Sequence, residues 1–213
     1  MNAKAVNRAS RMTSEDRRAS IMETACALFA DKGFRGTTTR ELAAAAGVTE
    51  PVLYEHFRTK RDLYSAIIES KARCGIEVLS ALDARFRHID DDYGFFVTLA
   101  DSIVDWYSED KAFIRLLLFS SLEDHELKNL FHERSRDCFH IVTSYIARRK
   151  AEGAVRESVD PPVAARAFFG MVAHYALYSI VFGVSPIPRP AKEVIREMAG
   201  IFLGGMCTQE LKK

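Results

Sequence analysis

The sequence has few cysteines and few prolines, and their positions exclude several classes of protein. The four cysteines are scattered without a CxxC pair, which argues against a disulfide framework and a zinc site and fits a reducing cytosol. The first 20 residues are polar and basic and lack the apolar run of a secretory signal. We therefore expect a cytoplasmic protein without a metal or cofactor. No nucleophile triad, phosphate loop or HExxH motif indicates an enzyme.

The distribution of proline indicates an all-α fold. No proline occurs between Pro51 and Pro161, so a long stretch is free of helix breakers. Apolar residues recur with a period of 3.6, and alternating strand patterns are not evident. About nine helices are predicted, near residues 14–31, 39–46, 49–57, 60–85, 92–108, 111–121, 124–151, 161–183 and 190–207. The residues predicted to cap three of them are Asp110, Asp124 and Asp160.

Charge is unevenly distributed along the chain. Residues 1–73 hold 13 Lys and Arg against 9 Asp and Glu, whereas the remainder is slightly acidic. A basic end on an acidic body is typical of a protein whose one end faces nucleic acid. The predicted organisation is a basic flexible arm over 1–13, a DNA-binding domain over 14–60 and a helical domain over 61–213.

The segment TTTRELAAAAGVTEPVLYEHF, residues 37–57, has the features of a helix-turn-helix. Gly47 supplies the backbone freedom that the turn between two short helices needs, and Val48 supplies an apolar side chain beneath it. Thr49 is predicted to cap the second helix with its hydroxyl. Pro51 falls in the first turn of that helix, where its missing N–H costs nothing.

A recognition helix in such a module lies in the major groove and reads bases with its N-terminal residues. The residues predicted at the base edges are Thr49, Glu50, Pro51 and Val52. The residues predicted to contact phosphates are Tyr54, His56 and Lys60, together with Thr39 and Arg40 at the start of the preceding helix. Each also has a structural interpretation, since the threonines can be caps and the tyrosine can be core.

From Ile21 to Ile68 the sequence resembles the N-terminal signature of the TetR family of transcriptional regulators. The matching stretch is IMETACALFADKGFRGTTTRELAAAAGVTEPVLYEHFRTKRDLYSAII. The resemblance implies a homodimer with one helix-turn-helix per subunit and a C-terminal helical domain that binds a small inducer. It also implies that the nine residues named above fall at DNA-contacting positions.

The last two predicted helices, about 161–183 and 190–207, carry small residues at close spacing. Ala164, Ala167, Gly170 and Ala173 recur every three positions in the first of them, and small residues permit close helix packing. The resemblance implies a four-helix dimer interface from these helices, which suits a palindromic operator.

The uncharged run 167–184 reaches membrane-spanning length, but a helix buried on all sides is the preferred interpretation.

An effector pocket is expected among the helices that follow the DNA-binding part. An aromatic lining with few polar groups would suit a hydrophobic or aromatic small molecule. The residues predicted to line it are Phe96, Ile103, Trp106, Tyr107, Phe113, Leu117, Phe139, Met171, His174, Tyr175 and Tyr178. The alternatives are a filled core, which would leave a constitutive or protein-partnered regulator, and a helical enzyme that carries a helix-turn-helix.

Three histidines, His125, His132 and His140, lie loosely on one face of the helix predicted over 124–151 and raise the question of a metal site. The two helical turns between His125 and His132 span about 10 Å, which is too far for both to bind one metal ion.

Overall fold

The computed structural model of the chain describes residues 12–122, 129–184 and 187–208. These residues are helical apart from turns, loops and one isolated bridge between Val155 and Cys207, which confirms the predicted all-α class. The helices are α1 (Ser14–Lys32), α2 (Thr39–Ala45), α3 (Glu50–His56), α4 (Lys60–Phe86), α5 (Asp92–Glu109), α6 (Lys111–Leu122), α7 (Leu130–Arg134), α8 (Arg136–Ala151), α9 (Pro161–Ala176), the π-helix η1 (Leu177–Val181) and α10 (Ala191–Met206).

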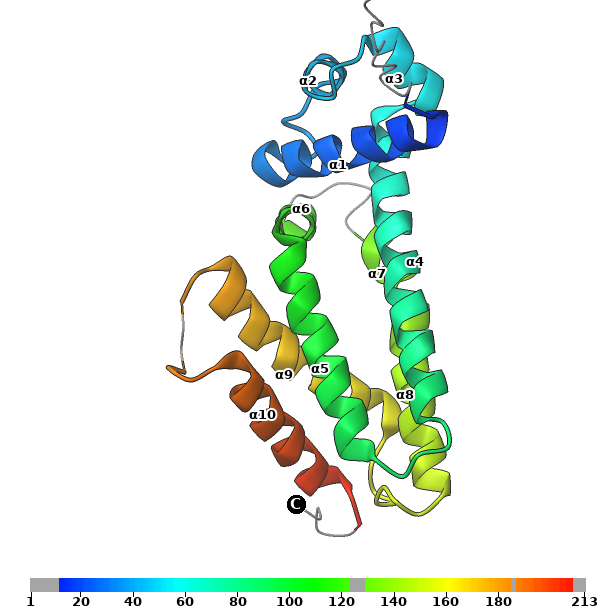
Figure 1. Cartoon of the computed structure of the whole chain (residues 1–213), viewed down its shortest axis with the longest axis vertical. Coiled ribbons are helices and arrows are strands. Elements are labelled where there is room, and N and C mark those ends of the chain that lie inside the picture. Colours follow the sequence, from blue (N-terminus) through cyan, green and yellow to red (C-terminus); the bar gives the residue numbers. More distant parts are fainter. Residues whose placement is uncertain (1–11, 123–128, 185–186, 209–213) are drawn as a thin grey trace, which may run out of the picture.

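The molecule is elongated, with the three short N-terminal helices at one end (Figure 1). α1 lies across that end, with α2 and α3 on its outer side and α6 beneath it. α4 starts beside α3 and descends along the body next to α8, while α5 runs down the middle and α9 and α10 lie on the opposite side. The end formed by α2 and α3 is therefore the part farthest from α10.

Two buried cores share the long helix α4. Its first half contributes Leu63 and Ile67 to a core that also contains Ile21 and Phe29 of α1 and Leu53 of α3. Its second half contributes residues to a separate core with α5, α8, α9 and α10, namely Leu79, Leu82 and Phe86. A single rigid helix therefore connects the helix-turn-helix to the rest of the body.

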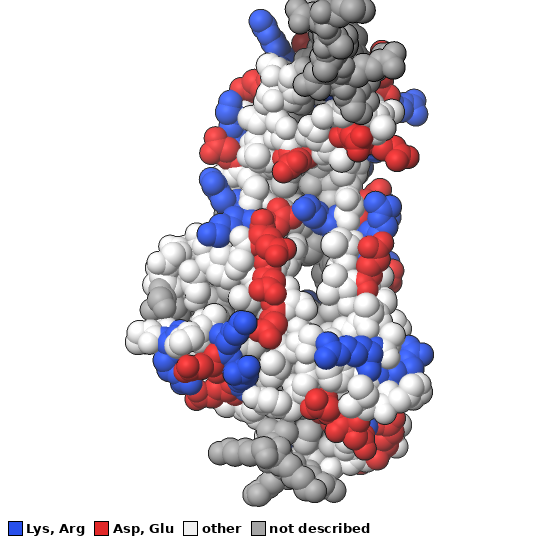
Figure 2. Space-filling view, in the orientation of Figure 1, with Lys and Arg blue, Asp and Glu red and all other residues white. Residues whose placement is uncertain are grey.

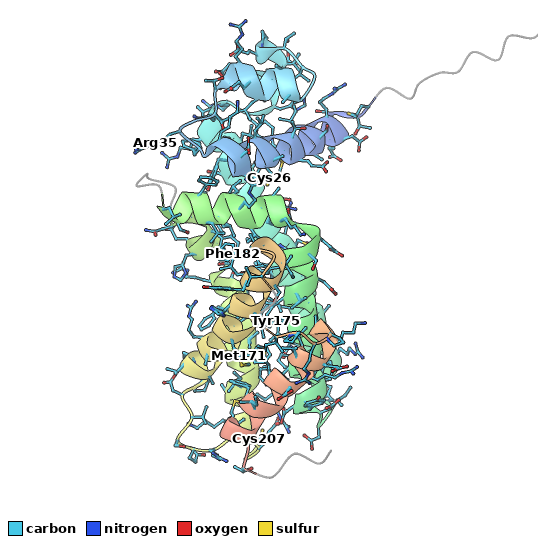
Figure 3. The ribbon with its side chains drawn as sticks, turned by 90° about the vertical axis from the view of Figure 1, so that its left-hand side faces the viewer. Cys26, Arg35, Met171, Tyr175, Phe182 and Cys207 are labelled. Atoms are coloured by element: carbon cyan, nitrogen blue, oxygen red, sulfur yellow. The ribbon has the colours of Figure 1, made fainter. Side chains whose placement is uncertain are left out.

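Helix α6 also belongs to the first core, although it lies far along the chain. Phe113 and Leu116 are buried against the N-terminal helices. Cys26 lies where α1 meets α6 (Figure 3), and burial raises the pKa of its thiol to about 12. An exposed ion pair, with 3.7 Å between Arg115 Nη2 and Asp31 Oδ1, also joins these two helices. The N-terminal helices and α6 therefore form one packed unit.

The second core contains a polar network at its far end. The Tyr145 hydroxyl donates to an Asp92 carboxylate oxygen at 2.7 Å, and Arg149 Nε donates to the same oxygen at 2.8 Å. The Tyr145 ring stacks on Phe95 with centroids 3.6 Å apart. This carboxylate fixes the start of α5 against α8, since all its partners lie on that helix.

Three sequence-based predictions need correction. The helix predicted over 124–151 is divided, because Ser135 separates α7 from α8. The helix predicted over 161–183 ends as an α-helix at Ala176 and continues as η1. It is also not buried on all sides in the single chain, since Val163 is 66% exposed and Phe182 53% exposed.

Two predicted caps are confirmed and several predictions fall on residues outside the description. The Asp160 carboxylate accepts from Val163 N at 3.0 Å, and that of Asp110 accepts from Phe113 N at 3.3 Å. Asp124, His125 and most of the basic arm lie outside the described residues.

By length and composition, the helix Pro161–Val181 is apolar enough to cross a membrane, with 33% of its most apolar window buried.

Candidate nucleic-acid interface

Helix α2 begins at a capping box. The Thr38 hydroxyl accepts from Glu41 N at 3.2 Å, and the Glu41 carboxylate accepts from Thr38 N at 2.9 Å. Lys32 of α1 also donates to Glu41 at 2.6 Å. These contacts lower the pKa of Glu41 to about 2, and the hydrogen bond from Lys32 is the largest cause. Because a capping box satisfies otherwise unpaired backbone groups, α2 starts at a defined residue and is tied to the end of α1.

The turn between α2 and α3 has the geometry that the sequence predicted. Gly47 has φ 65°, a left-handed conformation that glycine adopts without steric cost. Val48 N donates to Ala43 O at 2.9 Å, and its side chain packs against the first core. Pro51 lies in the first turn of α3. The turn is therefore set by the backbone conformations of Gly47 and Pro51 and by the packing of the Val48 side chain.

Helix α3 is held at its C-terminal end by α1. Leu53 and Phe57 are buried in the first core. Arg18 donates to the carbonyl of His56 at 2.5 Å, and its guanidinium lies over the Phe57 ring at 4.0 Å from the centroid. A cation at a helix C-terminus is favourable because carbonyls there carry partial negative charge. Arg18 of α1 thus positions the recognition helix.

At the N-terminal ends of the two helices, Thr39 of α2 and Glu50 of α3 are joined directly. The Thr39 hydroxyl donates to the Glu50 carboxylate at 3.0 Å, in a half-buried setting. The contact fixes the carboxylate, which is predicted to read a base. A carboxylate held in this way is an oriented acceptor for a cytosine amino group.

The predicted DNA-contacting residues lie on one end of the molecule but differ in exposure. Arg40, Thr49, Pro51 and Tyr54 are exposed, whereas Thr39, Glu50, Val52, His56 and Lys60 are half-buried. The predicted cap at Thr49 is wrong, because its side chain makes no capping hydrogen bond to α3. The Thr49 side chain therefore lies exposed beside the N-terminal turn of the recognition helix.

Lys60 has a structural role besides the predicted phosphate contact. Its ammonium donates to the carbonyls of Phe34 and Thr37, both at 2.7 Å, and lies 4.4 Å from the centre of the Phe34 ring. These bonds tie the start of α4 to the loop before α2. The lysine thereby supports the position of the helix-turn-helix on α4.

Sequence reasoning missed the threonine caps of α1, α2 and α4, although the signal was present. Thr13, Thr38 and Thr59 each precede an acidic residue by three positions, and each hydroxyl accepts from the backbone N–H of that residue. The spacing Ser/Thr-x-x-acid before a helical run predicts such caps.

The body presents acidic charge away from this end. Asp101, Asp105 and Glu109 follow one another at intervals of four residues along α5, and Figure 2 shows a column of acidic side chains over that helix. Acidic side chains repel the phosphate backbone. This face is therefore less suited to nucleic acid than the α2 and α3 end.

The predicted effector residues do not all meet in one place. Trp106, Phe113 and Leu117 pack against the first core, and Tyr107 makes an edge contact with Trp106 at 5.5 Å between ring centroids. Phe96 and Tyr175 are buried, and Ile103, Phe139 and Met171 pack against the second core. His174 and Tyr178 lie on the exposed face of α9 and η1, with ring centroids 4.6 Å apart.

Two family models match successive parts of the chain. The model for bacterial regulatory proteins of the tetR family matches residues 21–67, which span α1 to the start of α4. The model for the C-terminal domain of AefR-like transcriptional repressors matches residues 101–205, from α5 to α10. The chain belongs to the TetR family of transcriptional regulators.

Curated relatives of this TetR-family chain match mainly over its DNA-binding part. The transcriptional activator FasR of Mycolicibacterium smegmatis is 37% identical over 62 residues, 29% of this chain and 28% of FasR. The transcriptional repressor KstR2 of Mycobacterium tuberculosis is 36% identical over 75 residues, 35% of this chain and 34% of KstR2. These relatives are therefore matched over about a third of their own length.

The fold is shared over nearly the whole chain. The transcriptional regulator FadR of Bacillus subtilis, solved with stearoyl-CoA, has a TM-score of 0.72 to this TetR-family chain at 14% sequence identity. The match covers 88% of this chain and 98% of FadR. The likeness at this identity concerns the arrangement of helices.

Proposed function

We propose that the chain is a homodimeric repressor that leaves a palindromic operator when a small hydrophobic or aromatic molecule binds its C-terminal part. The observation that carries the proposal is the shared first core, in which Phe113 and Leu116 of α6 pack against the helices that support α3. A displacement of α6 therefore moves α1 and the recognition helix with it. Such a regulator acts in the cytoplasm, where its operator lies.

The aromatic cluster next to this core is the proposed effector site. Trp106 of α5 contacts Phe113 and Phe131, with ring centroids 6.0 and 6.2 Å away. Trp106, Tyr107 and Phe131 are only half-buried, and desolvation raises the pKa of the Tyr107 phenol. An apolar ligand inserted among these rings would bury the remaining surface and displace α6. Response requires that the ligand bind the two arrangements with unequal affinity.

The proposed dimer surface is the exposed apolar face of α9, η1 and α10. Tyr178 is 38% exposed, Phe182 53% and Ile201 67%, and Figure 3 shows Phe182 at the end of the column formed by α9 and η1. A Cβ added at Gly170, Gly204 or Gly205 would meet no atom within 4 Å. These glycines are therefore not required by packing within one subunit, and close approach of a partner helix explains them.

The dimer is tested by light scattering on Gly204→Trp. Because the position faces open space within the subunit, the variant is expected to fold with unchanged helicity but to elute as a monomer and lose operator binding. Ala81→Trp, an exposed position on α4, is the matched control and should stay dimeric. A Gly204→Trp dimer of unchanged mass would contradict the proposed surface.

Repression and its relief are tested by gel shift with the DNA upstream of the gene itself, at low salt. Trp106 is the only tryptophan of the chain, so its fluorescence reports on the proposed effector site directly. Stearoyl-CoA, the ligand of the structurally similar FadR, and a panel of aromatic molecules are the first probes. Release of DNA together with a change in Trp106 emission is expected. DNA binding that no probe perturbs would favour a constitutive regulator, and absence of binding to any duplex would refute the proposal.

A further inference from the structure

A surface groove lies between the α7–α8 junction and the N-terminal turns of α9, apart from the aromatic cluster at Trp106. Its volume is about 480 Å³, and its lining includes His132, Arg136, Phe139, His140 and Arg166. Two guanidinium groups and two imidazoles thus surround one cavity, with Asp137 as its one acidic lining residue. The groove carries net positive charge on a body that is otherwise slightly acidic.

The two arginines of the groove differ from Arg134 of α7 and Arg148 of α8. Arg134 pairs with Glu69 at 3.0 Å, and Arg148 pairs with Asp83 at 3.0 Å. Within the part of the chain that the structure describes, neither Arg136 nor Arg166 is within ion-pair distance of a carboxylate. Their N–H groups are therefore available to an external anion, even though Asp137 lies in the same groove.

The floor of the groove is apolar and ordered by ring contacts. The Arg166 guanidinium lies over the Phe139 ring at 4.3 Å from its centroid, and the centroid of the Phe139 ring lies 6.1 Å from that of Phe169. A stacked guanidinium keeps its edge N–H groups free for bidentate bonds. A second cavity of about 440 Å³ adjoins it, lined by Phe139, Val163 and Ala167 with Pro162 and Arg166. The anion-binding end thus continues into an almost wholly apolar one.

We propose that this groove binds a phosphate-bearing molecule with an apolar or planar body, such as a nucleoside diphosphate or an alkyl phosphate. The phosphate is bound by Arg136 and Arg166, whose planar forks match phosphate oxygens, with His132 and His140 as further donors. The body of the ligand lies along Phe139 towards Val163. The proposal does not depend on relief of repression by an effector, because the groove shares no residue with the helix-turn-helix or with the aromatic cluster at Trp106. Its apolar end, at Val163 and Ala167, adjoins Gly170 of the proposed dimer surface along the exposed face of α9.

Isothermal titration calorimetry on the full chain tests the site with three probes: ADP, decyl phosphate and inorganic phosphate. We expect ADP or decyl phosphate to bind about tenfold or more tightly than inorganic phosphate, since only they fill the apolar end. Tighter binding of ADP identifies a planar body, and tighter binding of decyl phosphate identifies an alkyl one. Binding of inorganic phosphate with equal affinity would show a bare anion site and would overturn the proposal.

Variants separate the groove from general surface charge. Arg136→Gln and Arg166→Gln are each expected to weaken the better probe about tenfold or more, because each removes a charge-assisted pair of bonds. Arg85→Gln is the matched control, since Arg85 is also exposed and lies over an aromatic ring, Phe86, at 5.2 Å. The proposal fails if no probe binds at millimolar concentration or if all three variants behave alike. Trp106 emission distinguishes this site from the effector site, since a groove ligand should leave it unchanged.

Discussion

The Thr39 hydroxyl donates to the Glu50 carboxylate at 3.0 Å and so joins the N-terminal ends of α2 and α3. This bond fixes an acceptor at the end of the recognition helix, where bases are read. It also links a residue predicted to contact phosphate to one predicted to read sequence. The bond therefore couples the positions of these two side chains.

Replacing Glu50 should change sequence preference rather than overall affinity. Glu50→Ala removes the acceptor, and the preferred base pair at one operator position should lose about 1–3 kcal/mol of its advantage. Thr39→Val keeps the carboxylate and should cause a smaller change at the same position. Selection of duplexes from a random pool, followed by competition binding, measures both. An unchanged preference in Glu50→Ala would contradict base reading by this residue.

Tyr54 should act on all sequences alike. Its side chain is 45% exposed on α3, and its hydroxyl is predicted to bond a phosphate oxygen. Tyr54→Phe should weaken every duplex by about 1 kcal/mol, the usual contribution of one hydrogen bond. Tyr93→Phe is the control, since Tyr93 is also exposed but lies on α5, with its hydroxyl directed at Arg196 O at 3.4 Å. A sequence-dependent effect of Tyr54→Phe would reverse the assignment.

Ser179 should be a site where removing a hydroxyl stabilises the fold. Elsewhere, helical hydroxyls donate to the carbonyl four residues earlier, as in Thr98 and Ser102. Ser179 lies in η1, where a π-turn displaces that carbonyl, and its buried hydroxyl has no hydrogen-bond partner within the described structure. Ser179→Ala should therefore raise the free energy of unfolding by about 1 kcal/mol.

The matched control for that stability measurement is Ser102→Ala, which removes a hydroxyl that already has a partner. Its free energy of unfolding should fall slightly or stay the same in urea titrations. If Ser179→Ala destabilises the protein as much as a lost hydrogen bond would, the hydroxyl has a partner in solution and the prediction is wrong.

Glu41 should contribute to the acid sensitivity of the DNA-binding end. Its pKa is about 2 in the folded chain against an ordinary value of 4.5, so the folded state favours the ionised form. The stabilisation is complete above pH 4.5 and is lost as the pH falls from there towards 2. Glu41→Gln should flatten the pH dependence of unfolding in that window. Asp62→Asn, at the corresponding cap position of α4, is the comparison, and equal flattening in both would deny Glu41 a special role.

The sequence by itself determined the class of fold and the position of the helix-turn-helix. Turn chemistry is local: Gly47 has the left-handed φ, and Pro51 lies in the first turn of α3, as their residue types require. The caps at Asp110 and Asp160 follow from the same short-range rule. Such features depend on neighbours within four residues, and the sequence displays those neighbours directly.

Tertiary structure alone decided which face of each helix is used and which distant residues meet. Apolar periodicity predicts burial of Trp106 and Phe96 in the same way. Trp106 nevertheless packs against the first core, whereas Phe96 is buried in the second core with residues of α9 and α10. Arg18 capping α3 and the Thr39–Glu50 bond depend on how whole helices cross. The π-turn at η1 and the break at Ser135 likewise override good local helix propensity. These outcomes are set by packing between elements far apart in the chain, on which local sequence carries little information.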